Sequence, residues 1–357
     1  MSRILIVPTY NYLSAPLIDK VIRFFGENHQ YALLTHHEHG ANFGELERDV
    51  RDRFSIDIQF RQPKRQLLGD KRTQQKMLRW VENYNPIRIV TFSDITLFSR
   101  AMKGTEFEQK MLVIQPCLLN QSPMSWKQQI KRIVNWSLNL CIGAPIRNID
   151  AFWGKGLARA TYIVWGNIEL EFYQQARNFI RGGLRFSALL DELKMNSDIE
   201  KQTSREIVII APDFNFYESQ KQVDAYFAEL KKLCAVSKFT VSIKYHPLNQ
   251  RSLPEIPNLT VLSELPLSRI RRCSIVISGY SNLAISARCL NPNIYIFDQC
   301  KYAIPHICSP YFQFIQSLDC LIEDIDGSED KKTRQEQDAF LQDVFFEDKH
   351  RLSELRI

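Results

Sequence analysis

Short apolar runs alternate with amphipathic stretches along the whole chain of 357 residues. In the first half, the runs of strand length occupy residues 3–8, 87–92 and 111–116. Apolar residues between positions 17 and 25 recur at helical spacing, and we expect that helix to begin at Pro16. Residues 77–85 predict a second helix that ends at Pro86. Strands without a polar face, alternating with helices, predict a parallel sheet covered on both sides.

The same alternation restarts in the second half of the chain. The strand-like runs are residues 206–212, 239–247, 259–265, 273–278 and 293–298. Residues 222–235 place their apolar side chains on one face of a helix. A polar stretch at residues 194–206 lacks apolar periodicity and separates the two sets. The sequence therefore predicts two Rossmann-like, doubly wound α/β domains facing a cleft, at residues 1–195 and 205–357.

The composition suits such domains and excludes several other classes of protein. Hydrophobic residues make up 45% of the chain and charged residues 24%, which is not a disordered composition. The start does not resemble a signal peptide, no apolar run reaches the roughly 18 residues of a membrane span, and the eight cysteines form no CxxC pair. We expect a cytoplasmic protein. No basic stripe with interleaved aromatics appears, so nucleic-acid binding is not expected.

The net charge of +6 is unevenly distributed. Residues 1–200 carry 27 Lys and Arg against 20 Asp and Glu, whereas the remaining residues carry 19 against 20. A basic first half favours an anionic partner, either a membrane surface or an acidic substrate. The alternative is a solvated surface with ordinary scatter of charge.

Polar residues follow three strands of the second half, at the edge where open α/β sheets bind ligands. They are Asp213 after the first strand, Lys244 and His246 after the second, and Ser278, Gly279, Tyr280, Ser281 and Asn282 after a later one. An imidazole can hydrogen-bond or neutralise a phosphate, and a helix N-terminus offers free N–H groups to an anion. Taken singly, a His-Pro pair is common in turns and a Ser before a helix is usually an N-cap. Together they predict a phosphate-binding edge.

Three places compete for a catalytic base. Asp213 ends a strand on the predicted cleft, and Asp94 follows the strand at residues 87–92. The cluster HHEHG at residues 36–40 could bind a metal, but its spacing lacks the i,i+4 pattern of a helical zinc site, so a polar loop is the expectation. The lone DxD, Asp324-Ile325-Asp326, lies in an acidic stretch and predicts a solvated loop. We expect neither metal nor cofactor.

Five segments resemble one group of enzymes. They are ATYIVWGNIELEFY (160–173), EIVIIAPDFN (206–215), SIKYHPLN (242–249), the stretch 259–282, and MLVIQPCLL (111–119). These segments are similar to bacterial GT-B-fold glycosyltransferases of capsule and surface-polysaccharide synthesis, including sialyltransferase-, Kdo-transferase- and glycerophosphotransferase-like enzymes. The resemblance implies that His246 contacts the donor's phosphate or nucleotide and that Ser281 and Asn282 hold the phosphate.

The sequence departs from that group after the phosphate-binding turn. Ser286-Ala287 stands where Glu-Ala is usual, and Asn291-Pro292-Asn293 stands where Gly-x-Pro is usual. A carboxylate acceptor for the ribose is therefore missing, which leaves the nucleotide open.

The function expected from these observations is metal-independent transfer of a sugar from a CMP-, CDP- or UDP-linked donor to a capsular or surface polysaccharide or a glycolipid. His246, Lys244 and the turn at residues 278–282 would stabilise the leaving phosphate. The alternatives are a polyol-phosphate transferase, a nucleotide-sugar 2-epimerase, against which Ser286 weighs, and a non-catalytic subunit of a polysaccharide assembly complex.

Residues 125–143 predict an amphipathic helix. One face carries Trp126, Ile130, Ile133, Ser137, Leu140 and Cys141, with Trp136 near its edge. Lys127, Lys131 and Arg132 add positive charge, a composition typical of helices that bind a membrane interface. The alternative is a helix that packs on its own domain. A membrane partner would place the protein on the inner face of the cell membrane.

Overall fold

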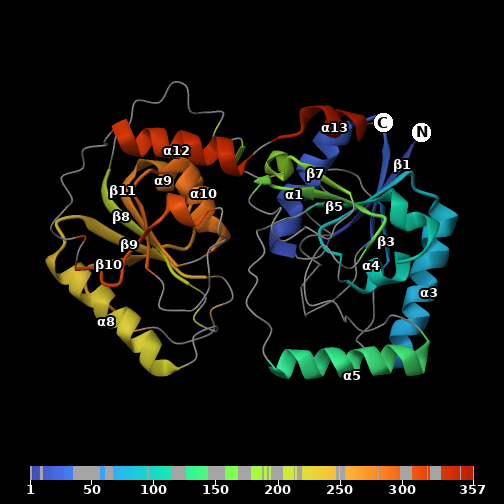
Figure 1. The fold of residues 1–357 in the computed structure, drawn as a ribbon, viewed down its shortest axis with the longest axis horizontal. Coiled ribbons are helices and arrows are strands. Elements are labelled where there is room, and N and C mark those ends of the chain that lie inside the picture. Colours follow the sequence, from blue (N-terminus) through green and yellow to red (C-terminus); the bar gives the residue numbers. More distant parts are fainter. Residues whose placement is uncertain are drawn as a thin grey trace. The chain divides into compact units, whose positions relative to one another are not determined.

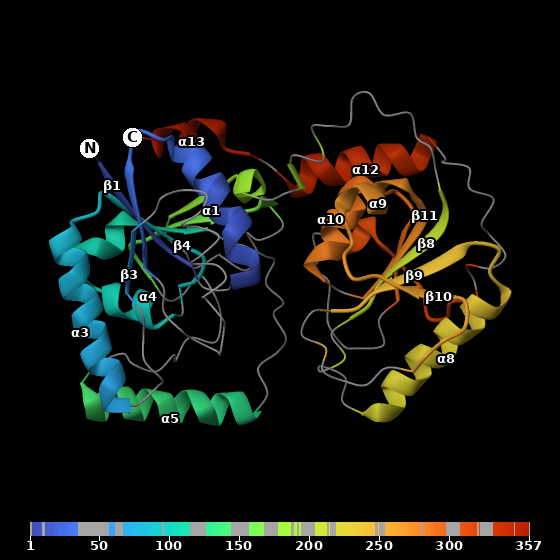
Figure 2. The same cartoon turned by 180° about the vertical axis from the view of Figure 1, so that it is seen from behind.

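Two parallel β-sheets, one in each of two units, form the framework of the protein (Figures 1 and 2). The structure is a computed structural model, and it describes residues 2–8, 11–34, 57–60, 67–94, 96–114, 126–143, 157–167, 178–186, 189–190, 193, 204–212, 214, 219–246, 249, 254–279, 281–297, 308–319, 321, 331–345 and 347–356. Unit 1 comprises Met1–Ala188 and Phe345–Ile357, and unit 2 comprises Leu189–Val344.

Unit 1 contains a seven-stranded sheet in the order β3-β2-β1-β4-β5-β6-β7. The strands are β1 (Arg3–Val7), β2 (Gln30–Leu34), β3 (Asp57–Phe60), β4 (Arg88–Thr91), β5 (Met111–Ile114), β6 (Thr161–Val164) and β7 (Phe179–Arg181). The helical segments are α1 (Asn11–Phe25), α3 (Leu67–Tyr84), α4 (Leu97–Met102), η1 (Glu106–Lys110), α5 (Trp126–Ile142), η3 (Gly183–Phe186) and α13 (Lys349–Glu354). Every neighbouring pair of strands is parallel.

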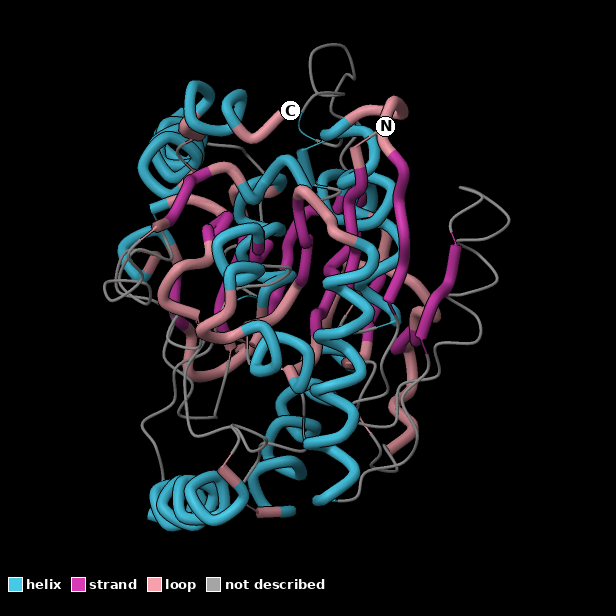
Figure 3. Tube along the Cα trace, turned by 90° about the vertical axis from the view of Figure 1, so that its right-hand side faces the viewer, coloured by secondary structure: helices cyan, strands magenta, loops and turns pink. Residues whose placement is uncertain are grey.

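Both faces of this sheet are covered, which explains why its strands lack a polar face. Alternate side chains of a strand point to opposite faces. In β1, Ile4 and Ile6 pack in a core with α1, whereas Leu5 and Val7 pack in a second core with α3 and α4. Figure 3 shows the helical and strand segments in a side view.

The helix boundaries in unit 1 differ in part from those expected. The helix α3 ends at Tyr84, where Asn85 has a left-handed φ of 48° and Pro86 follows, as predicted. The helix α1, however, begins at Asn11 and not at Pro16. A proline near a helix start sacrifices only one backbone hydrogen bond, so Pro16 does not by itself fix where the helix begins.

Unit 2 contains a six-stranded sheet in the order β10-β9-β8-β11-β12-β13. The strands are β8 (Ser204–Ile210), β9 (Thr240–Lys244), β10 (Leu259–Val261), β11 (Cys273–Ser278), β12 (Ile294–Ile296) and β13 (Gln313–Phe314). The helical segments are α8 (Gln220–Val236), α9 (Leu267–Arg272), α10 (Asn282–Leu290), η6 (Ser309–Tyr311) and α12 (Lys331–Val344). The helix α8 covers one face of the sheet, and α9, α10 and α12 gather on the other (Figure 1).

The last helix of the chain belongs to unit 1. The backbone N–H of Asp348 donates to the Arg181 carbonyl (3.0 Å), and Arg351 Nη1 donates to the Phe179 carbonyl (2.9 Å). Gly182, with φ +144°, lies directly against the side chain of Leu352, so any larger residue there would overlap it. The domain ranges expected from the sequence, 1–195 and 205–357, did not separate this final segment from the second domain.

The two sheets share a strand order. In each, three successive strands step to one side, and the chain then returns to the other side of the first strand. This return creates a topological switch point, between β1 and β4 in unit 1 and between β8 and β11 in unit 2. Ligands of open α/β sheets bind at such points, beyond the carboxyl ends of the strands.

Candidate functional site

The polar strand ends predicted in the second half meet at the switch point of unit 2. The central strand β8 pairs with both neighbours at its last residue, since Ile210 is opposite Lys244 of β9 and Ser278 of β11. The pairing continues one residue further. The N–H of Ala211 donates to the Lys244 carbonyl (3.0 Å), and the N–H of Gly279 donates to the Ile210 carbonyl (3.3 Å). Lys244 and the Ser278–Gly279 turn thus flank the same strand end.

The helix α10 begins two residues after this turn. Ser281 is its N-cap, with extended backbone angles (φ −154°, ψ 162°), and its Oγ accepts a hydrogen bond from the N–H of Ala284 (3.1 Å). The hydroxyl of Ser281 is therefore used by the helix, as an ordinary N-cap would use it. Such a cap leaves further first-turn N–H groups and the positive end of the helix dipole directed at the switch point, where they suit an anion.

Three consecutive residues at the end of β9 have distinct environments. Lys244 is half-buried, and its Nζ donates to the carbonyl of Ser263, just beyond β10. Tyr245 packs against the core beneath α8, and this burial, together with nearby Cys234, raises the pKa of its phenol. His246 is half-buried, and its carbonyl accepts from the N–H of Asn249 (3.0 Å), which closes a turn. His246 is thus held at the edge of the sheet by its own backbone.

Ser278 lies behind the edge and does not line it. Its side chain is fully buried, and Oγ donates to the Gly279 carbonyl (2.7 Å). The Ser278 carbonyl accepts from the N–H of Phe297 (2.9 Å), so the residue is held on both sides. Its role in the structure is to fix the turn that leads to α10.

Part of the predicted site falls outside the described residues. Asp213 and Tyr280 are not among them, and only the backbone of Asn282 is described. The cluster at residues 36–40 and the pair Asp324 and Asp326 also lie outside. Within the described part of the chain, no three His, Cys, Asp or Glu side chains are grouped so that they could hold a metal ion.

Asp94 belongs to unit 1, so it is not grouped with the other predicted residues. It follows β4 at the switch point of that unit, and its side chain is buried. Its Oδ2 accepts a hydrogen bond from Tyr162 Oη on β6 (3.0 Å). Burial, followed by the charge of Asp94, raises the pKa of Tyr162, and the Leu157 N–H also donates to Tyr162 Oη (3.2 Å). This pair ties the β4 loop to β6 and shields the carboxylate from solvent.

The buried polar loop around Asp94 was not predicted from the sequence. Thr96 Oγ1 accepts from the N–H of Ser99 and thereby caps α4 (3.0 Å). Ser99 Oγ and Thr91 Oγ1 both donate to the carbonyl of Ser93, at 2.6 and 3.3 Å. The signal in the sequence was only Thr96, a residue type that is common at the N-cap, directly before the apolar pair that opens α4. These bonds fix the shape of the loop.

One of the two departures from the expected family pattern has a structural explanation. Asn291 is the C-cap of α10 with φ −133°, a conformation that does not require glycine. Its buried Nδ2 donates to the carbonyls of Ile270 (2.9 Å) and Cys273 (2.8 Å), while its Oδ1 accepts from the N–H of Asn293 (2.9 Å). Ser286, the other departure, is 7% exposed on α10, and nothing in the structure explains why Ser stands there.

A second polar group in unit 2 lies near the amino ends of the strands, away from the switch point. Arg269 Nη2 on α9 contacts Glu206 Oε1 on β8 at 2.6 Å, and Ser242 Oγ on β9 donates to the same oxygen (2.7 Å). This hydrogen bonding to Glu206 raises the pKa of Arg269. Because it joins three elements and faces the opposite edge, we assign this group to stability. A lone Glu in the apolar run of β8 was its signal in the sequence.

Comparison with known proteins identifies the fold but no family. No family model matches the sequence, and no curated protein matches it. A structure assigned as a UDP-N-acetylglucosamine 2-epimerase from Listeria monocytogenes is 13% identical, with a TM-score of 0.56, over 96% of this chain and 91% of that chain. The glycotransferase of kitacinnamycin is 10% identical, with a TM-score of 0.56, over 96% of this chain and 94% of that chain. The UDP-GlcNAc 2-epimerase of Methanocaldococcus jannaschii, in complex with UDP-GlcNAc and UDP, is 9% identical, with a TM-score of 0.51, over 100% of this chain and 99% of that chain.

These similarities confirm the predicted architecture of two Rossmann-like α/β domains, the GT-B fold. Both transferases and epimerases are built on it, so the fold alone does not choose a reaction. The narrower resemblance to capsule-type enzymes stays a prediction.

Proposed function

We propose that the protein is a glycosyltransferase that takes its sugar from a nucleotide-linked donor, whose phosphates bind at the switch point of unit 2. The observation that carries the proposal is the convergence of the Ser278–Gly279 turn, the N-terminus of α10 and the Lys244–His246 strand end on either side of β8. The turn positions the N-terminus of α10, and that helix end together with the side chains of Lys244 and His246 offers the hydrogen-bond donors and positive charge that suit a diphosphate.

Each part has a role in the proposed transfer. First-turn amides of α10 bind the phosphate, and His246 donates a hydrogen bond to it or neutralises it as imidazolium. This stabilises the leaving nucleotide as negative charge develops on it, which is the main requirement of a transfer without a metal. Lys244 adds a positive charge beside the strand end while its Nζ is held by the Ser263 carbonyl.

We assign the base that deprotonates the acceptor hydroxyl to Asp213 on its place in the sequence, three residues after the end of β8. Asp94 is the weaker candidate, because its carboxylate is buried and accepts from Tyr162 Oη. For the acceptor we propose a capsular or surface polysaccharide or a glycolipid, made in the cytoplasm.

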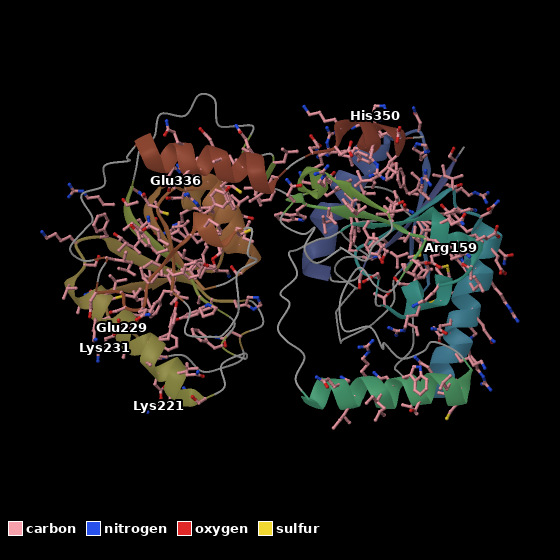
Figure 4. All side chains as sticks on the ribbon, viewed as in Figure 1. Arg159, Lys221, Glu229, Lys231, Glu336 and His350 are labelled. Carbon is pink, nitrogen blue, oxygen red and sulfur yellow. The ribbon has the colours of Figure 1, made fainter. Side chains whose placement is uncertain are left out.

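The nucleotide is tested by thermal unfolding of the protein with CMP, CDP, UDP and their sugars. A ligand that binds only the folded state at 100 times its Kd adds about 2.7 kcal/mol to the free energy of unfolding. We expect a UDP- or CDP-linked compound to raise the Tm and a His246→Ala variant to lose most of that shift. His350→Ala is the matched control, since His350 is an exposed histidine of unit 1 (Figure 4). No shift with any nucleotide would support a non-catalytic subunit.

An epimerase is the second candidate, because two of the similar structures carry that description. NMR spectra of the nucleotide sugar, recorded with and without an acceptor, distinguish epimerisation from transfer. An epimerase converts its nucleotide sugar with no acceptor present, whereas a transferase releases the nucleotide only when an acceptor is added. Conversion of UDP-GlcNAc alone would replace our proposal. Transfer of glycerol phosphate from a CDP-linked donor to the acceptor, with release of CMP, would favour the polyol-phosphate alternative.

A further inference from the structure

The helix α5 exposes a concentration of large apolar side chains. Among the described residues, eight such side chains are exposed, and five of them lie on α5: Ile130 (50% exposed), Ile133 (63%), Val134 (50%), Trp136 (53%) and Leu140 (60%). The remaining three are spread over unit 2. Scattered exposed hydrophobics are normal, but five on one helix form a patch.

The two sides of α5 are reversed relative to an ordinary surface helix. A helix turns about 100° per residue, which places Ile130, Ile133 and Leu140 on one side. Among the side chains of α5 that the structure describes, at residues 129–142, the partly covered ones lie on the opposite side, and they are Asn135, Leu138, Asn139 and Ile142. Two of these four are asparagines, so the more polar side faces the protein and the apolar side faces outward.

The orientation of α5 is fixed at its C-terminal end. Lys71 Nζ on α3 donates to the carbonyl of Ile142 (2.9 Å). In Figures 1 and 2, α5 accordingly lies across the end of α3 and not over the sheet. The exposed apolar side is therefore presented by a helix that is anchored to the rest of unit 1.

The charged residues of α5 itself are all basic. On the helix, Lys131 and Arg132 are exposed; Arg132 lies next to Trp136 at the border of the apolar face, whereas Lys131 lies on the side of Asn135 and Ile142. In the sequence, residues 109–149 contain five Lys or Arg and no Asp or Glu. Long basic side chains flanking an apolar face can reach anionic headgroups while the face enters the bilayer interface.

We propose that α5 is an interfacial helix that lies flat on an anionic lipid surface, with Ile130, Ile133 and Leu140 in the apolar layer, Arg132 at the headgroups, and Lys131 adding to the electrostatic attraction from further round the helix. Among the described residues, no helix is long and apolar enough to cross a membrane, so we propose that α5 binds at the membrane surface and does not span the bilayer. Two copies of this face pressed together would bring like charges close, which disfavours self-association as its use. The proposal does not depend on what unit 2 binds.

Sedimentation of the full chain with lipid vesicles tests the electrostatic part. We expect binding to vesicles that contain phosphatidylglycerol, weak binding to pure phosphatidylcholine, and a loss of binding as salt is raised. The double variant Lys131→Glu/Arg132→Glu should lower the partition coefficient at least about tenfold. The matched control is Lys221→Glu/Lys231→Glu on α8, which changes the same charge on exposed positions of unit 2 (Figure 4).

A second pair of variants tests the apolar part. Ile133→Ser/Leu140→Ser should lower vesicle binding by about tenfold or more. The control Val261→Ser/Phe314→Ser removes exposed apolar side chains of unit 2 and should leave vesicle binding unchanged. Partition of either α5 variant equal to that of its control would overturn the proposal. So would a wild-type dimer, seen by ultracentrifugation without lipid, that Ile133→Ser/Leu140→Ser dissociates.

The nucleotide-induced Tm shift is measured on the same variants. It should be unchanged in both α5 variants, because the switch point lies in unit 2. Failure of the vesicle experiment then leaves the proposed function standing, and failure of the nucleotide experiment leaves the lipid contact standing.

Discussion

The helices α5 and α8 are each 17 residues long and both are amphipathic, yet they use their apolar sides in opposite ways. The apolar side of α8 is buried on the unit 2 sheet through Val223, Tyr226, Phe227, Leu230, Leu233 and Cys234. Its outward side carries Lys221 and Lys231, among others (Figure 4). The helix α5 directs its apolar side outward.

The contrast shows what periodicity does and does not determine. Spacing of apolar residues fixes which positions share a helix face, but not whether that face meets a sheet, a lipid surface or water. The neighbours decide. Around α8, Phe214 and Phe297 of the unit 2 core complete a set of ring contacts with Tyr226, with centroids 5.2 and 5.3 Å apart.

The largest expected difference between the two helices is the cost of removing one leucine. Leu230 of α8 is fully buried, so Leu230→Ala should lower the free energy of unfolding of unit 2 by about 2–5 kcal/mol. Leu140→Ala on α5, where the side chain is 60% exposed, should change stability by no more than about 0.5 kcal/mol. Urea titrations followed by circular dichroism measure both. An equal loss of stability in the two variants would mean that Leu140 of α5 is also packed against an apolar surface.

The next effect concerns the start of α8. Ser219 and Gln222 form a capping box, in which Ser219 Oγ accepts from the Gln222 N–H and Gln222 Oε1 accepts from the Ser219 N–H. Ser219→Ala should lower stability by about 1 kcal/mol. Ser219→Asp preserves the acceptor and should restore most of that loss in the same denaturation experiment. A full loss in both variants would argue against the cap.

A smaller, pH-dependent effect is expected at Glu229 on the same helix. Hydrogen bonds from Ser317 and Lys232, with the Leu318 N–H, lower the pKa of this carboxyl below its ordinary 4.5. The stabilisation is therefore fully present above pH 4.5 and is lost as the pH falls through the lowered pKa. Glu229→Gln should cost stability at pH 7, and the gap to the wild type should narrow as the solution is acidified. A gap that is constant with pH would assign the effect to packing.

The smallest expected effect is that of Lys131→Glu on α5. Its side chain is exposed, so the substitution should change the free energy of unfolding of unit 1 by no more than about 0.5 kcal/mol. The corresponding shift in Tm should be small. The same substitution should weaken vesicle binding in the experiment described above. A stability change above about 1 kcal/mol would indicate an intramolecular contact that the exposure of Lys131 does not suggest.

Much of the fold could be predicted because buried parallel strands leave a strong signal. The run RILIV of β1 is apolar at every position after Arg3, since its two sets of side chains enter two different cores. The short edge strands β7 and β13 were missed, because three and two residues carry too little pattern to be seen. The helix start at Asn11 was missed because Pro16 suggested a later one.

The candidate site was predictable in its position but only partly in its chemistry. The ends of β8, β9 and β11 meet because parallel strands share a carboxyl edge, which the sequence pattern already implies. That Ser278 faces inward could not be predicted, because the parity of a strand's last residue depends on the register of its neighbours. The carboxylate of Asp94 was likewise assigned without its partner, since Tyr162 lies 68 residues away in the chain.

The return of α13 to unit 1 has a consequence for how the chain is made. Leu352 and Leu355 belong to the core that also contains Ile4, Ile6 and Leu33, from strands that precede unit 2 in the chain. Unit 2 is thus an insertion within unit 1, and it emerges whole from the ribosome before the last pieces of the unit 1 core exist. Unit 1 therefore starts to be synthesised before unit 2 but is completed after it. Until α13 is synthesised, Leu352 cannot pack against Gly182.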